Sequence, residues 1–280
     1  MNTRYISKAD RIFTENLNDV LNNGYSTVGH KVRPVYKDGT PAHTIYINQV
    51  VDKYDISKGE FPITTTRPIA WKSAIKEILW IYQDQTNDLS VLEDKYGIMW
   101  WRDWEVDGSN TIGQRYGATV KEYDLINKLL NGLTNEPYTR RHIIDLYQYA
   151  DFNQPGLVPC AFLSVFSVRN GFLDLTLHQR SSDFLVANAI NKIQYVALLM
   201  MVARHVGLKP GMFMHVVDNL HIYDRHVEQA KELLSRTPSE KQPRLVLKEG
   251  KTNFYDFTID DFEMIDYEPV KPQLKFDLGI

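Results

Sequence analysis

The chain has 280 residues, of which 43% are hydrophobic and 24% charged, a composition typical of a packed globular protein. Its 32 Lys and Arg residues nearly balance 35 Asp and Glu residues, and the net charge of -3 excludes a general basic field for nucleic acid or an anionic membrane. The longest apolar run, 196–203, is too short to cross a bilayer and we see no signal peptide, so we expect a cytoplasmic protein.

Regular elements in the first third of the chain are predicted from hydrophobic spacing and turn signals. Apolar residues at helical spacing predict an amphipathic helix over 8–22, which an Asn-Asn-Gly run ends. A turn then leads into a β-rich strand at 44–47. Thr66 is expected to cap a largely buried helix, with Pro68 in its first turn and its end near Tyr82.

The rest of the chain alternates between predicted strands and helices. The segment 99–117 is rich in aromatic residues and in Gly, Asn and Asp, which predicts an ordered loop. An Asn-Gly pair within 163–177 predicts a β-hairpin. There follow an apolar helix at 188–205, a strand at 212–217, an amphipathic helix at 224–236, and β-like runs at 244–248 and 262–267. Because we see no repeat, low-complexity stretch or linker, we expect one α+β domain over 1–280.

The one cysteine of the chain, Cys160, cannot form an internal disulfide and is either a small buried hydrophobe or a reactive group. It lies at the start of a β-like run, and Arg180 lies at the end of the predicted hairpin, so the two can meet across a sheet. A guanidinium next to a thiol raises the fraction of thiolate, the nucleophilic form. Arg180 is therefore the expected activator of Cys160.

Motifs on both sides of Cys160 carry a more specific signal. They are Pro159-Cys160, Gln179-Arg180-Ser181-x-Asp183, Asn191, His221-x-Tyr223, Lys76-Glu77-Ile78-Leu79-Trp80, Trp101-x-x-Trp104, Gly113 to Gly117, Arg140-Arg141 and the ending Gly279-Ile280. In this order and spacing they make the chain resemble the thymidylate synthase family over essentially its whole length. The resemblance implies a large mixed β-sheet covered by helices, and a homodimer that pairs sheet to sheet.

The chemistry that the resemblance implies is the reductive methylation of dUMP to dTMP. 5,10-Methylenetetrahydrofolate would donate the one-carbon unit and the hydride and leave as dihydrofolate, with no metal, flavin or NAD(P). Cys160 matches the nucleophile that adds to carbon 6 of uracil. Glu77 matches the family's acid/base carboxylate and Tyr116 the residue near the proton lost from carbon 5. Without the resemblance, Glu77 would be a surface residue paired with Lys76 or Lys72.

Binding of the dUMP phosphate is assigned by the same resemblance. A phosphate dianion calls for planar bidentate donors, and Arg33, Arg180 and Ser181 match the family's phosphate binders. Arg140 and Arg141 match the pair that enters the active site of the partner subunit. Adjacent arginines are otherwise a solvated surface pair.

The base and sugar of dUMP are assigned to three further residues. Asn191 matches the residue that reads the uracil edge, for which a carboxamide offers one donor and one acceptor. It favours uracil over cytosine, because related dCMP hydroxymethylases carry a carboxylate there; its structural alternative is a helix cap. His221 and Tyr223 match the pair that binds the deoxyribose hydroxyl, and would otherwise be structural polar residues.

The folate site is expected on the other side of the nucleotide. Asp183 matches the carboxylate that binds the pterin ring, Trp101 would form a wall of the site, and Ile280 belongs to the closing tail. The alternative for the aromatic residues is core packing.

Several residues depart from the commonest family pattern and concern folate and inhibitor binding. Trp100 stands where an aliphatic residue is frequent, and the other departures are Ala161, Ala187, Ala189, Val217 and Asp218. Three other functions stay open: a dUMP hydroxymethylase, in which water replaces the hydride; an RNA-binding regulator, disfavoured by the net charge; and a thiol redox sensor, which lacks a resolving cysteine.

Overall fold

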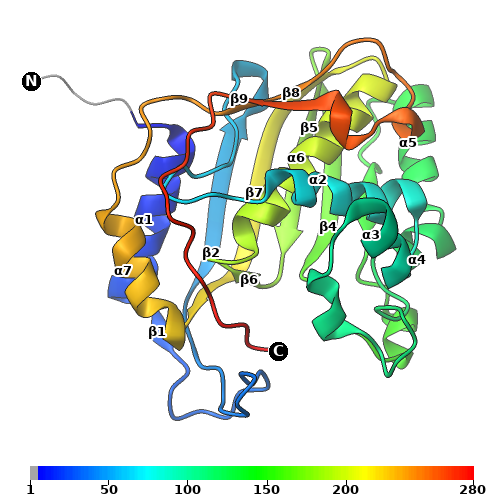
Figure 1. The fold of residues 1–280 in the computed structure, drawn as a ribbon. Coiled ribbons are helices and arrows are strands. Elements are labelled where there is room, and N and C mark those ends of the chain that lie inside the picture. The colour runs from blue at the N-terminus through cyan, green and yellow to red at the C-terminus, as the bar shows by residue number, and fades with distance from the viewer. Residues whose placement is uncertain (1–5) are drawn as a thin grey trace, which may run out of the picture.

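The structure is a computed structural model that describes residues 6–280. Residues 1–5, part of the N-terminal stretch in which we see no signal peptide, lie outside the described residues. Within 6–280, a mixed seven-stranded sheet crosses the molecule in the order β1-β2-β7-β5-β4-β3, with β6 paired to β7 (Figure 1). Its strands are β1 (Tyr25–Ser26), β2 (Thr44–Asp55), β3 (Ile143–Asp145), β4 (Ala161–Arg169), β5 (Phe172–Gln179), β6 (Ser182–Asp183) and β7 (Lys209–Tyr223). The expected α+β class and large mixed sheet are confirmed.

Helices cover one face of this sheet (Figure 1). They are α1 (Lys8–Asn23), α2 (Trp71–Leu79), α3 (Leu89–Tyr96), α4 (Gly117–Glu122), α5 (Leu125–Asn135), α6 (Asn188–His205) and α7 (Val227–Ser235). The largely buried α6 packs on β5 and β7, and α2 packs on α6. The α1 helix lies against β2 and α7. A separate two-stranded sheet joins β8 (Arg244–Leu247) to β9 (Phe262–Ile265).

The second face of the large sheet is apolar but only partly buried within one chain. Along β7, the buried side chains of Phe213 and His215 alternate with the half-buried side chains of Met212, Met214 and Val216. Successive residues of a strand point to opposite faces, so the half-buried set lies on the face away from α6. No helix within 6–280 is long and apolar enough to cross a membrane.

The predicted hairpin is confirmed and contains a β-bulge. Asn170 and Gly171 both have positive φ, 50° and 80°, as a two-residue turn that matches strand twist requires. Ala161 pairs with Gln179 and Leu163 with His178, so Phe162 is one residue in excess on β4. A bulge of this kind bends a strand and redirects its side chains, and this one directly follows Cys160.

The predicted start of the second helix was wrong. The helix α2 begins at Trp71, after Ala70, and not near Thr66. The segment before it is extended because buried Asp10 accepts hydrogen bonds from the Thr64 hydroxyl at 2.8 Å and from the Thr65 amide at 2.6 Å. This contact lies more than fifty residues away in the sequence and overrides the local capping signal. Beyond Leu79 the helix continues as a π-helical turn to Asp84, close to the predicted end.

Other predicted elements differ mainly in length. The strands β2 and β7 run far beyond the predicted 44–47 and 212–217, because they pair with each other along almost their whole length. The elements α3, α4, α5, β1, β3 and β6 were not predicted. The helices α1, α6 and α7 and the pair β8–β9 lie where they were expected, with a 3-10 turn opening α7. The aromatic segment 99–117 is mostly irregular, as predicted, around a 3-10 turn at Trp100–Trp104.

A buried ion pair joins the sheet to α6. The ammonium of Lys192 in α6 contacts the carboxylate of Asp52 in β2, and both side chains are about 5% exposed. Asn16 donates a second hydrogen bond to Asp52, at 3.1 Å. Burial, and then the Lys192 charge, lower the pKa of His215 to about 3, so this imidazole is neutral.

Candidate active site

The β4–β5 hairpin brings Cys160 and Arg180 together, as the sequence predicts. The Arg180 amide donates to the Cys160 carbonyl at 3.0 Å, and one guanidinium nitrogen lies 3.6 Å from the sulfur. The guanidinium also donates to the carbonyls of Pro159 at 2.9 Å and Val158 at 2.8 Å. Because the guanidinium is held by the two backbone carbonyls that directly precede Cys160, its position relative to the sulfur is defined.

The ionisation of Cys160 is set by two opposing effects. Burial raises the pKa of the thiol, whereas the charges of Arg180 and Arg33 lower it; the effect of burial is larger, so the pKa is raised overall. The expected influence of Arg180 is therefore present but does not by itself produce a thiolate. A half-buried thiol beside a guanidinium also differs from the apolar filler that composition alone suggested.

Tyr116 joins Cys160 to the aromatic segment. Its hydroxyl accepts a hydrogen bond from the Cys160 amide at 3.3 Å, and its ring lies 5.2 Å from that of Trp101. The Tyr116 backbone has φ 49° and ψ -109°, an unfavourable conformation for a residue with a side chain. Such strain is characteristic of residues whose side-chain position matters.

Glu77 is buried in α2, which contradicts its reading as a surface residue. Its side chain is 5% exposed, Lys76 turns away to the Tyr96 carbonyl, and Lys72 lies over the ring of Trp71. Burial raises the pKa of Glu77 to about 7, against the opposing effects of Gln194, Trp100 and Trp101. The Trp100 indole N–H donates to its Oε2 at 2.6 Å. A carboxyl group with this pKa can exchange a proton near neutral pH.

Asn191 belongs to a chain of amide groups rather than to a helix cap. Its oxygen accepts from Gln179 at 2.9 Å, and its nitrogen donates to Gln194 at 3.0 Å. The neutral imidazole of His215 lies 2.8 Å from the Gln179 oxygen. Since an oxygen can only accept, His215 donates, and Gln179 presents its NH₂ group to Asn191. The cap of α6 is Ala187.

His221 and Tyr223 lie next to each other at the end of β7, beside the C-terminal segment. Their rings are 5.5 Å apart, and burial lowers the pKa of His221 to about 4. The Tyr223 hydroxyl donates to the Gly279 carbonyl at 3.1 Å. Ile280 and Val35 exchange backbone hydrogen bonds of 3.0 and 2.8 Å, so Ile280 is held against the segment that carries Arg33.

Asp183 lies in β6, which follows the hairpin strand β5 along the same edge of β7, and it pairs in register with His221. Its Oδ1 accepts from the amides of Leu185 and Val186, each at 3.1 Å, and burial raises its pKa to about 7. Ser181 is half-buried between Arg180 and this strand.

The remaining predicted arginines are exposed. Arg33 lies near enough to Cys160 to act on its pKa. Arg140 and Arg141 lie in the segment before β3, and nothing in the described part of the chain brings them to Cys160. Their exposure agrees with a surface pair and equally with a pair that another subunit receives.

Three residues of the site had no role assigned from sequence. Trp100 contacts Glu77, and Gln179 and Gln194 hold Asn191. Gln179 was visible as part of the Arg180 motif, and Gln194 lies one helical turn after Asn191, on the same face.

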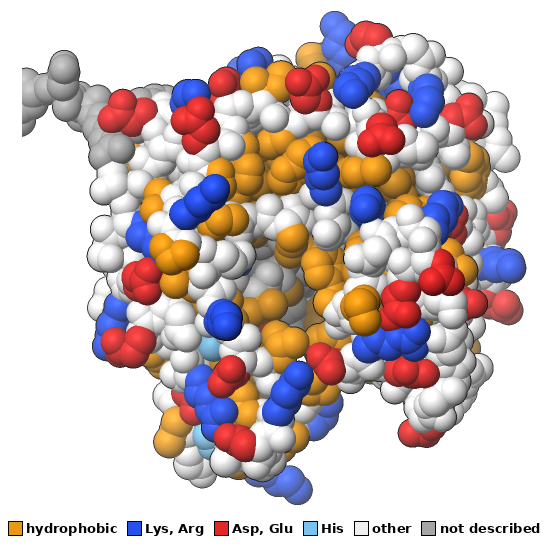
Figure 2. All heavy atoms as spheres, in the orientation of Figure 1, with side chains coloured by type: hydrophobic (Ala, Val, Ile, Leu, Met, Phe, Trp, Pro, Cys, Tyr) orange, Lys and Arg blue, Asp and Glu red, His pale blue; other side chains and the backbone are white. Residues whose placement is uncertain are grey.

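The molecular surface agrees with a site at this place. The face in Figure 2 is hollowed near its centre, between α7 on one side and α3 on the other. Hydrophobic side chains lie inside the hollow and several Lys and Arg side chains surround it. The contacts described above bring a half-buried thiol next to one guanidinium and near a second, the arrangement expected of an enzyme with a cysteine nucleophile and an anion site.

Comparisons with known proteins give the family. The sequence model of the family described as "Thymidylate synthase" matches residues 11–280. The thymidylate synthase of Streptococcus suis (strain 05ZYH33) is 57% identical over 281 residues, covering 98% of this chain and 100% of that protein. That of Streptococcus pneumoniae (strain 70585) is 56% identical with the same coverage.

A solved structure gives the same answer at the level of the fold. The thermostable thymidylate synthase A from Bacillus subtilis superposes with a TM-score of 0.90 and 33% sequence identity, covering 97% of this chain and 99% of that one. The chain therefore belongs to the thymidylate synthase family. The predicted family, fold and reaction are confirmed: this is a methyltransferase family that makes dTMP from dUMP with methylenetetrahydrofolate as co-substrate.

Proposed function

We propose that this chain methylates dUMP through Cys160, with the other predicted site residues in the roles that the family resemblance implies. The observation that carries the proposal is the contact of 3.6 Å between the Arg180 guanidinium and the Cys160 sulfur. The deprotonated sulfur adds to carbon 6 of uracil, and the electron pair of the 5,6 double bond moves toward carbon 5 and the carbonyl oxygen at carbon 4. Arg180 stabilises the sulfur anion before the addition.

Glu77 and Tyr116 are the groups that handle protons around this addition. Glu77 exchanges a proton with the substrate region, for which its pKa of about 7 is suited. Tyr116 lies beside the nucleophile and is placed to assist when carbon 5 loses its proton. Before this proton is lost, carbon 5 bonds to the one-carbon unit of methylenetetrahydrofolate. The electron pair that the proton leaves behind expels tetrahydrofolate and gives an exocyclic methylene on the ring. Hydride from the folate adds to this methylene, and the electron pair returned to the ring breaks the bond between carbon 6 and sulfur, which releases dTMP and Cys160.

The phosphate of dUMP is assigned to Arg33, Arg180 and Ser181, and to Arg140 and Arg141 of a second subunit. Support for a dimer comes from the apolar, half-buried second face of the sheet described above. A second copy would bury this face in the sheet-to-sheet arrangement that we predict. It would also give the exposed pair Arg140–Arg141 a ligand.

The uracil edge is assigned to Asn191 and the deoxyribose hydroxyl to His221 and Tyr223. The amide chain through Gln179 and Gln194 supports the first assignment, because it fixes which end of the Asn191 carboxamide is the oxygen and which is the nitrogen. Neutral His221 has one donor and one acceptor nitrogen, so it can donate a hydrogen bond to a hydroxyl or accept one from it.

Asp183, Trp101 and Ile280 are the residues that would hold the folate, which supplies the one-carbon unit and the hydride. The structure is compatible with this, because a carboxyl group with a pKa near 7 can exchange hydrogen bonds with a pterin ring. Trp101 offers an indole face, and the Ile280–Val35 contact closes the site at its end. A cytoplasmic location is part of the proposal, because a reducing compartment keeps the Cys160 thiol free.

The test is an assay of purified protein with dUMP and methylenetetrahydrofolate. Dihydrofolate is followed by absorbance and the nucleotide product is identified by mass, for the parent chain and for Cys160→Ser. We expect dTMP with one dihydrofolate per turnover, and none from Cys160→Ser at unchanged thermal stability. Hydroxymethyl-dUMP without dihydrofolate would instead indicate the hydroxymethylase, and no nucleotide product would refute the proposal.

A further inference from the structure

Trp100, in the aromatic segment 99–117, contacts Glu77 and is a further residue of the site. Trp100 donates its indole N–H to Glu77 Oε2 at 2.6 Å, and the side chain of Trp100 is only half-buried. Trp100 opens the 3-10 turn Trp100–Trp104, and the next residue, Trp101, packs its ring on Tyr116. One short turn therefore contacts both the buried carboxyl group and the tyrosine beside Cys160.

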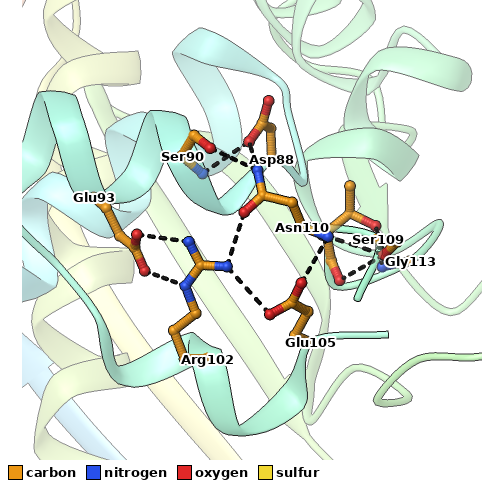
Figure 3. A network of polar contacts seen from close by, with 9 residues as sticks. Asp88, Ser90, Glu93, Arg102, Glu105, Ser109, Asn110 and Gly113 are labelled. Atoms are coloured by element: carbon orange, nitrogen blue, oxygen red, sulfur yellow. Dashed lines mark hydrogen bonds and ion pairs between the residues drawn. The ribbon is translucent and has the colours of Figure 1, made fainter. Parts of the chain in front are cut away.

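Arg102 anchors this turn to α3. Its guanidinium forms a two-pronged contact with Glu93, and it also donates to Glu105 at 3.2 Å and to Asn110 at 2.8 Å (Figure 3). Bidentate contacts between arginine and a carboxylate fix direction as well as distance. Figure 3 shows the guanidinium between the two carboxylates, with Asn110 at its third side.

Asn110 extends the anchor into the helix start. Its side-chain nitrogen donates to Asp88 at 2.9 Å and to Ser90 at 2.6 Å, and its backbone amide donates to Glu105 at 2.7 Å (Figure 3). Both ends of the segment 102–110 are thus tied to the same helix. The turn has little freedom to carry Trp100 away from Glu77.

We propose that Trp100 is a positioning residue that holds the Glu77 carboxyl group in one orientation, and that Arg102 acts through it by fixing the turn. This rests on the proposed role of Glu77 in proton transfer. A donor directed at one carboxylate oxygen restricts rotation of the group and stabilises its ionised form. Trp100 therefore sets both where Glu77 exchanges its proton and the pH at which it does so.

The effect of Trp100 on the pKa of Glu77 can be measured, because no other described residue that faces Glu77 changes charge near neutral pH. The titratable ones are Tyr116, at the start of α4, and Tyr195, in α6. Burial raises the pKa of Tyr195 to about 12 and that of Tyr116 well above its ordinary value, so neither changes charge near neutral pH. The other facing groups, Gln194 and Trp101, do not titrate.

The test is the pH dependence of kcat for Trp100→Phe, which keeps a ring and removes the donor. We expect the acidic limb of the profile to move up by about one pH unit, because loss of a hydrogen bond to a charged group disfavours the carboxylate by about that much. At pH 7 kcat should fall several-fold, and KM for dUMP should change less than about two-fold. Trp104→Phe is the matched control, because it makes the same change in the same turn. The ring of Trp104 packs on Trp101, so this variant should leave the acidic limb in place.

Arg102→Gln supplies a second, independent variant if Trp100→Phe folds poorly. It should move the acidic limb in the same direction. In the Trp100→Phe background it should add little, because both variants disrupt the same contact, that of Trp100 with Glu77. An unshifted limb in both variants, or full additivity of the two, would overturn the inference. Glu77→Gln identifies the limb: if that variant keeps it, the limb belongs to another group and the inference is also wrong. Failure of the parent chain to make dTMP is a different result, since it refutes the proposed function itself.

Discussion

The buried ion pair between Asp52 and Lys192 allows a quantitative prediction about stability. Lys192→Met keeps the length of the side chain and removes its charge, which leaves Asp52 buried at 5% exposure. Burial alone would raise the pKa of Asp52, but the Lys192 charge and hydrogen bond outweigh it and hold the pKa below its ordinary value. Without Lys192, burial becomes the dominant effect on Asp52.

The expected loss follows from what remains around the carboxylate. Removing one partner of a buried ion pair typically costs about 3–5 kcal/mol, because the other charge is left uncompensated. Asn16 still donates a hydrogen bond to Asp52 in the variant, at 3.1 Å in the parent structure. We therefore expect a loss near the lower end of the range, about 3 kcal/mol at pH 7.

Urea unfolding followed by circular dichroism, at one fixed protein concentration, measures this loss. In the variant the folded pKa of Asp52 lies above its unfolded value, so protonation favours the folded state and the loss should shrink as the pH falls toward 4. Asn in place of Asp52 in the same variant should recover most of the stability. Arg11→Met, which breaks an exposed i,i+4 pair, is the control and should cost less than about 0.5 kcal/mol. A loss at pH 7 no larger than that of the control, or one that grows at low pH, would refute the reasoning.

Three further outcomes are expected. Gly117→Ala would place a Cβ 2.2 Å from the carbonyl oxygen of Thr86, so we expect urea unfolding to show a loss of about 1–3 kcal/mol; a neutral effect would mean that this backbone contact can move. Gly279→Ala would place a Cβ 2.5 Å from the ring of Tyr223, and steady-state kinetics should show a higher KM for methylenetetrahydrofolate at nearly unchanged stability; an unchanged KM would argue against a role of the tail. Asp183→Asn should weaken folate binding but increase stability. The pKa of Asp183 is raised in the folded state, so the parent chain loses stability as the pH rises from about 4 to about 7. Urea unfolding at pH 4 and at pH 8 should therefore show the gain in stability only at pH 8.

Local signals in the sequence predicted the part of the site that one hairpin builds. The Asn-Gly turn and the alternation around it place Arg180 next to Cys160, and the structure has this contact. The identities of the other site residues came from the family resemblance. For Arg140 and Arg141 the prediction stays open, because their proposed ligand lies in another subunit.

The bounds that the sequence predicted wrongly depend on contacts far along the chain. Asp10 holds the segment before α2 extended, and β2 carries the buried charge of Asp52 because Lys192 neutralises it. Neither partner is visible to a local pattern. The role of Trp100 was hidden for the same reason, since Glu77 lies more than twenty residues before it and only the folded turn brings the two together.

The bulge at Phe162 makes the position of the nucleophile sensitive to residue number as well as residue type. Ala161 is buried together with Ser164 and Phe166, an odd and two even positions, because the extra residue reverses the alternation of β4. Deleting Phe162 would let the strands pair without interruption. It would also turn the side chain of Cys160 toward the opposite face of the sheet, away from its present position beside Arg180. Such a chain could keep its sheet and lose its chemistry, whereas an insertion at the exposed turn would change neither. We therefore expect length changes among related chains to collect at the turn and to be absent from the strands on either side of it.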